Sequence, residues 1–235
     1  MAESNYEKTK RACAQAFCET DHSALIERFG LEQDANYLYV RFFEQPFRLS
    51  KRTGTIERRE ECEAPGTPTE TTWSEAQFNE AMTIYDLLGY AQPACHASGT
   101  MINMKSLHTK IAATAPRPSS IYAAQEARLA ALEAKHRSIL AQAAQAIGGA
   151  QLDKADASAQ FTVMDDLAMQ VQLWLPDEDF PASLQFFWDE NVLQYMHYET
   201  VWYANGFILE ELEAQCRKLL GAEGEVLPQA LPAKR

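Results

Sequence analysis

The sequence predicts an α+β protein, built as a single domain in which helices pack on a mainly antiparallel sheet. Apolar residues recur at helical spacing near both ends of the chain, and two stretches between them are patterned as strands. A length of 235 residues with 46% hydrophobic residues suits one large core. We expect this domain to cover residues 1–220 and residues 221–235 to form a disordered tail.

Helices are expected at the start of the chain. Within the first thirty residues, Asp21 is placed to cap a second short helix, and Gly30 is placed to end it in the left-handed conformation. The run 37–43 is rich in aromatic and β-branched residues and predicts a strand. Pro46 interrupts this run, which suggests a strand end or an edge strand.

A hairpin is predicted next. Residues 47–50 and 55–58 flank a short turn in which Gly54 is suited to a positive φ angle. The following stretch, 63–69, contains Pro, Gly and Thr and is a loop by composition. The N-terminal strands should therefore form a meander.

A helix and a long loop follow the meander. Ser74 and Gln77 have the spacing of a capping box, which predicts a helix that begins just after Ser74 and ends at Gly89. Residues 90–118 hold several Pro and Gly residues and are expected to form a loop with one short helix near Ser106.

The second half of the chain contains the longest predicted elements. One helix should run over 120–147, where apolar residues recur at helical spacing and two glycines then end it. Residues 167–175 and 184–188 alternate with period two and predict a hairpin with one buried face. A last helix is expected over 198–220. The other face of the first of these strands carries Ala168, Gln170, Gln172 and Trp174.

Charge and composition exclude several classes of protein. The formal net charge of −12 argues against nucleic-acid binding, which needs clustered Lys and Arg, and disfavours anionic membranes. No stretch has the length and apolarity of a membrane span, and the N-terminus has no signal-peptide pattern. The five cysteines are odd in number and irregularly spaced, as free thiols are. We therefore expect a cytoplasmic protein with a small-molecule or protein partner.

Several segments resemble a bacterial family of unknown function that is common in anaerobes, whose members stand alone or are fused to an iron–sulfur cluster domain. This chain carries no cysteine cluster of the kind that such a fused domain uses. The resemblance therefore implies a role in anaerobic metabolism but assigns no chemistry. It rests on Tyr85-Asp-Leu-Leu, Ala146-Ile-Gly-Gly, Leu175 through Pro181, Trp188-Asp189, and Leu193 through Glu199.

Cysteine and histidine provide the first candidate site. Cys95 and His96 lie in the predicted loop, with His108 shortly after them, and a thiol and imidazoles could bind a metal or activate a nucleophile. No established metal-ligand spacing supports this reading, so an ordinary loop is the alternative. Cys13 and Cys18 fall roughly 140° apart on a helix, which suits a half-buried and a surface thiol better than a metal pair.

Aromatic and acidic residues provide two further candidates. A pocket for a flat ligand is one hypothesis for the aromatic cluster, and ordinary core packing is the alternative. Carboxylates at the ends of the predicted hairpin strands could gather to bind a cation or to carry out acid–base chemistry, or could be a solvated acidic turn. The aromatic candidates are Trp174, Trp188, Tyr195, His197, Tyr198 and Trp202, with Tyr203 in the same cluster, and the acidic ones are Asp165, Asp166, Asp177, Glu178, Asp179, Asp189 and Glu190.

Two functional hypotheses remain open at this point. The first is a non-enzymatic accessory module that binds a small ligand, a cofactor or a protein in anaerobic metabolism. The second is an enzyme of unknown reaction that uses the Cys/His loop or the strand-end carboxylates, with or without a metal. The chain has no phosphate-binding glycine loop and no nucleophile elbow, and nothing in it specifies a cofactor.

Overall fold

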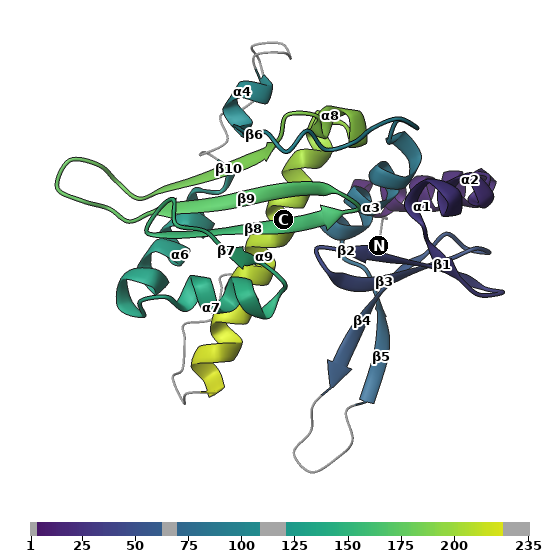
Figure 1. The fold of residues 1–235 in the computed structure, drawn as a ribbon. Coiled ribbons are helices and arrows are strands. Elements are labelled where there is room, and N and C mark those ends of the chain that lie inside the picture. Colours follow the sequence, from purple (N-terminus) through teal and green to yellow (C-terminus); the bar gives the residue numbers. More distant parts are fainter. Residues whose placement is uncertain (1–3, 63–69, 109–120, 223–235) are drawn as a thin grey trace.

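The computed structural model describes residues 4–62, 70–108 and 121–222, and these form an α+β fold, as predicted. The strands form two five-stranded antiparallel sheets instead of the one sheet expected. Figure 1 shows the two sheets next to each other, in contact through the second and eighth strands of the chain, with the C-terminal helix running beside the second sheet. The predicted loop at 63–69 and residues 223–235 of the predicted tail lie outside the described residues, while residues 221 and 222, also expected in the tail, belong to the last helix.

The N-terminal helices are α1 (Asn5–Glu19) and α2 (His22–Phe29). Asp21 caps α2, since its side chain accepts a hydrogen bond from the backbone N–H of Ser23 at 2.9 Å. Gly30 ends α2 with a φ of 60°. Both predicted helix boundaries are confirmed.

The first sheet is a meander of strands in chain order, and each strand is antiparallel to the next. Leu38, Phe47 and Ile56 point into the core and are fully buried. The predicted turn at Gly54 is confirmed, with a φ of 71°. Pro46 lies at a strand end, one of the two positions expected for it: it is the second residue of its strand, pairs with Arg41 on one side and precedes the ladder on the other. The strands are β1 (Glu32–Gln33), β2 (Tyr37–Phe42), β3 (Gln45–Ser50), β4 (Ile56–Cys62) and β5 (Glu70–Glu75).

Helix α3 (Phe78–Tyr90) begins three residues later than predicted. Ser74 belongs to β5, and its hydroxyl donates a hydrogen bond to Glu60 instead of capping a helix. The cap is Gln77, whose backbone N–H donates to the carboxylate of Glu80 at 2.5 Å. The predicted capping box was therefore wrong because pairing with β4 keeps this segment extended through residue 75.

The second sheet has the order β6-β10-β9-β8-β7. Its central hairpin confirms the prediction, with Leu173 opposite Leu184 and Met169 opposite Trp188. Gln170 and Gln172, expected on an open face, are only 3–4% exposed and hydrogen-bond to each other at 3.1 Å. The strands are β6 (Met101–Asn103), β7 (Ala150–Gln151), β8 (Ala157–Met164), β9 (Leu167–Trp174) and β10 (Ser183–Asp189).

The long helix predicted over 120–147 is two helices, α6 (Ala123–Lys135) and α7 (Ile139–Ala146). Buried Glu133 explains the break, because its carboxylate accepts hydrogen bonds from the backbone N–H groups of Ser138 and Leu140 at 2.7 and 3.0 Å. The start of α7 is thus capped by a side chain from the preceding helix.

The remaining helices are α4 (Met104–His108), α8 (Val192–Tyr195) and α9 (Tyr198–Ala222). Helix α9 confirms the predicted last helix and packs against both α3 and α7. One hydrophobic core runs from Phe17 to Leu220 and includes residues of both sheets. Within the described ranges, no helix combines the length and apolarity needed to cross a bilayer.

Candidate functional site

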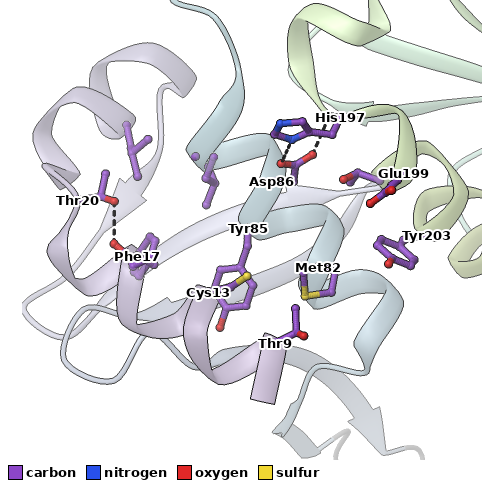
Figure 2. A pocket seen from close by; sticks show the side chains of 15 residues that line it. Thr9, Cys13, Phe17, Thr20, Met82, Tyr85, Asp86, His197, Glu199 and Tyr203 are labelled. Carbon is purple, nitrogen blue, oxygen red and sulfur yellow. Dashed lines mark hydrogen bonds and ion pairs between the residues drawn. The ribbon is translucent and has the colours of Figure 1, made fainter. Parts of the chain in front are cut away.

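A cavity of about 470 Å³ lies where α1, α2 and α3 meet the start of α9 (Figure 2). Its lining is mostly apolar, and its ionisable carboxylates and imidazole stand on α3 and at the start of α9. A hollow of this size and character is typical of small-ligand sites. The described residues that line it are Thr9, Cys13, Ala16, Phe17, Thr20, Leu25, Met82, Tyr85, Asp86, Leu88, Gly89, His197, Glu199, Thr200 and Tyr203.

Helix α1 forms one wall of the cavity through a single face. Thr9, Cys13, Ala16, Phe17 and Thr20 recur every three or four residues, so they lie along one side of the helix. None of the five is charged. Of the fifteen residues of α1, Phe17 is the one classed as buried.

The rim of the cavity contains a histidine–carboxylate pair. The backbone N–H of His197 donates to Oδ2 of Asp86 at 2.8 Å, and Nδ1 of His197 lies 2.7 Å from Oδ1 of the same carboxylate. Because a carboxylate only accepts, Nδ1 carries the proton of this hydrogen bond. The other ring nitrogen, Nε2, is then a free proton acceptor when the imidazole is neutral. The ring of Tyr90 packs on His197 with centroids 3.8 Å apart.

Glu199 and Tyr203 continue the rim along α9, two and six residues beyond His197. Burial raises the pKa of the Tyr203 phenol, and the nearby carboxylate of Glu199 raises it further. No Lys or Arg is among the described residues that line the cavity. The rim is therefore acidic, with His197 as its one basic group.

Cys13 is the thiol of the cavity. Burial raises the pKa of Cys13, and the negative charge of Asp86 raises it further. Both effects keep the sulfur protonated at neutral pH, and a thiol is a much weaker nucleophile than a thiolate. The cavity thus holds a sulfur that can contact a ligand but is not activated to attack one.

The Cys/His candidates lie elsewhere. Cys95 is buried, and its Sγ lies 2.8 Å from a guanidinium nitrogen of Arg28, while His96 is exposed with its Nδ1 3.2 Å from the carbonyl of Ala94. His108 is the last residue of α4, and its side chain lies outside the described residues. No group of three potential metal-ligating side chains occurs in the described part of the chain.

The acidic candidates divide between the two ends of the second sheet. Asp166 and Asp189 accept hydrogen bonds from the backbone of the loop before β6, at Ala97 and at Ser98 respectively. Asp166 also accepts a hydrogen bond from the hydroxyl of Tyr195. Asp177 instead accepts hydrogen bonds from the backbone N–H groups of Asp179 and Phe180, within the turn between β9 and β10. The carboxylates near β6 fix the loop that contains Cys95, which is a structural role.

Of the six aromatic and histidine candidates, His197 lines the cavity and the others do not. Trp188 and Tyr195 are buried in the core, and Nε1 of Trp188 donates to Asn205 at 3.0 Å. Trp202 packs between Tyr122 and Tyr198. Trp174 is half-buried at the end of β9.

Two rim residues were not predicted as site residues. Asp86 was quoted within the run Tyr85-Asp-Leu-Leu, but nothing in that run shows that its partner stands 111 positions later. Glu199 was visible as a first-turn acid that favours the helix dipole, which explains it without function. The sequence signal that could have identified Asp86 was a charged residue set among apolar sequence neighbours.

Comparison with known proteins gives one match. The profile of the family described as "Domain of unknown function (DUF3786)" matches residues 21–211. Neither the curated proteins nor the solved structures include a match. The matched region contains α2, α3 and the first half of α9, and it begins after α1.

Proposed function

Because the chain belongs to the DUF3786 family, whose description carries no activity, we propose a function from the cavity itself: the protein binds a small ligand between α1, α3 and α9. The observation that carries the proposal is the apolar hollow of about 470 Å³ with a few polar groups at one rim. Volumes of roughly 300–1,000 Å³ with this division of polarity are usual for small-molecule sites. A role in anaerobic metabolism remains a prediction from the resemblance.

Binding is favoured over covalent catalysis by the state of Cys13. A nucleophilic cysteine needs a lowered pKa or an adjacent base, and here burial and Asp86 raise the pKa of the thiol. The Cys95 loop offers no better centre, since the sulfur is buried and hydrogen-bonded to Arg28.

A test of occupancy can use the two cysteines of α1. Cys13 lines the cavity and Cys18 does not, so a bound ligand should protect Cys13 from iodoacetamide and leave Cys18 unchanged. A fragment library is first screened by thermal shift, and alkylation of each cysteine is then followed by mass spectrometry with and without each hit.

A cavity-filling variant gives an independent control. Gly89 lines the cavity, and a Cβ added there meets no atom within 4 Å, so Gly89→Leu should fold and occlude the hollow. Gly221→Leu is the matched control, since Gly221 is also a helical glycine with open space and lies outside the cavity. The proposal would be refuted by hits that bind Gly89→Leu with the same affinity as the wild type and leave Cys13 unprotected.

A second candidate, proton transfer, is favoured by the Asp86–His197 pair. An imidazole oriented by a carboxylate through Nδ1 has its Nε2 available as a general base. The test is hydrogen–deuterium exchange of acidic carbon-bound protons in bound hits. Catalysed exchange with the wild type that is absent in His197→Gln, at unchanged affinity, would establish an enzyme. Equal exchange in both proteins would exclude this role.

A further inference from the structure

The charge of the cavity rim identifies the class of ligand. We propose that the bound molecule has an apolar body and a cationic head, most simply a primary amine, with the head beside Glu199 and Tyr203. This inference rests on the proposed function and adds the chemical class of the ligand. The rim residues that carry it are Asp86, His197, Glu199 and Tyr203.

Asp86 and Glu199 place two carboxylates at the rim, opposed by His197 alone. Both oxygens of Asp86 are engaged by His197, through its backbone N–H and its Nδ1. Glu199 is exposed on the first turn of α9 and remains accessible to a ligand. An ammonium group there gains charge-assisted hydrogen bonds, whereas an anion meets like charge.

None of the three cations of α1, which are Lys8, Lys10 and Arg11, is among the residues that line the cavity. Lys10 is directed toward β5, where its Nζ lies 2.6 Å from Glu75 and 2.7 Å from the carbonyl of Ala76. Arg11 lines a different hollow, together with Thr53 in the turn between β3 and β4. The face of α1 that borders the cavity is uncharged, so α1 does not offset the negative charge of the rim.

Tyr203 adds a second attraction for a cation. Tyr203 lines the cavity one helical turn beyond Glu199 on α9, and Figure 2 shows the two side chains near each other. An ammonium near a carboxylate can also contact the negative face of an aromatic ring. The apolar body of the ligand then lies against Phe17, Met82 and Leu88.

The experiment compares three probes with one body: 2-phenylethylamine, 2-phenylethanol and phenylacetate. Each is titrated against the wild-type chain by calorimetry at low ionic strength. An exposed charge pair is worth up to about 1 kcal/mol, so the amine should bind about fivefold more tightly than the alcohol. Phenylacetate should bind more weakly than the alcohol.

Two variants test whether Glu199 is the group that favours the amine over the alcohol. Glu199→Gln should remove most of the advantage of the amine and leave the affinity for the alcohol unchanged. Glu190→Gln, at an exposed carboxylate just after β10 and outside the cavity, should change neither affinity.

The failures of the two proposals are distinguishable. If the three probes bind with similar affinity and Gly89→Leu abolishes binding of all three, the cavity binds ligands but the cationic head is wrong. If phenylacetate binds most tightly, the charge argument is also overturned. If no probe binds and Cys13 is never protected, both proposals fail together.

Discussion

Glu80 should control how the stability of this protein depends on pH. It is the third residue of α3, only 3% exposed, and Oε1 accepts a hydrogen bond from the backbone N–H of Gln77. Its other oxygen lies 3.7 Å from Arg58, which is already held by two hydrogen bonds of 2.5 and 2.6 Å to Glu211. Arg58 therefore offsets the negative charge of the buried Glu80 carboxylate only in part.

The magnitude follows from the pKa of Glu80. Burial raises this pKa from 4.5 to about 7, against the opposing effects of the Gln77 hydrogen bond and of Arg58. Below pH 4.5 the carboxyl is protonated in both the folded and the unfolded chain. Between pH 4.5 and pH 7 the unfolded chain ionises while the folded carboxyl stays protonated, so about 3 kcal/mol of stability is lost over this range, at about 1.4 kcal/mol per pKa unit, and no more is lost above it.

The test is Glu80→Gln, which keeps an acceptor for Gln77 and carries no charge at any pH. The free energy of unfolding is measured in urea at pH 5 and at pH 8. The difference between variant and wild type should shift in favour of the variant by up to about 3 kcal/mol from pH 5 to pH 8. Glu7→Gln is the matched control, because Glu7 holds the same position in α1 but is exposed. A variant whose stability runs parallel to wild type over this range would refute the reasoning.

Two further predictions concern packing. Gly54→Ala should destabilise the fold by about 3 kcal/mol or more, because φ is 71° and the new Cβ would lie 2.1 Å from the carbonyl oxygen of Ala14. Gly30→Ala, with a φ of 60° and open space, should cost only about 1 kcal/mol, and equal losses in chemical denaturation would contradict the steric argument. Asn205→Leu should cost about 1–3 kcal/mol by leaving the indole N–H of buried Trp188 without its acceptor, and combining it with Trp188→Phe should cost less than the sum of the two single changes.

The elements that the sequence predicted well are those whose signals are local. Asp21 and Gly30 mark the ends of α2 through their own side chain and backbone, and the alternation after Leu167 marks β9. Elements were missed where a distant group decides the outcome. The break before α7 depends on Glu133, five residues before Ser138, while the apolar spacing continues across the break.

The tight turn between β2 and β3 escaped prediction for a different reason. It places Phe43 and Glu44 at positive φ, although neither is glycine or asparagine. The backbone N–H of Phe43 donates to the carbonyl of Val163 at 2.9 Å, so the second sheet helps to hold the turn. Its conformation follows from tertiary contact instead of local sequence.

The candidate site was predictable only in part. His197 was identified as a ligand-binding candidate, and the structure places it on the cavity rim. Asp86, Cys13 and Glu199 join it there from three helices. The spacing between them along the chain gives no indication of that meeting, since helix packing and not a motif brings them together.

The small buried part of α1 has a consequence for how fast a ligand would leave the cavity. Because α1 buries Phe17 alone among its fifteen residues, we expect it to detach at a lower free energy than global unfolding. Since α1 is a wall of the cavity, each detachment would expose the proposed binding site to bulk water. If the cavity binds a ligand as proposed, the opening rate of α1 should set the residence time of that ligand, and occupancy should slow amide exchange along α1.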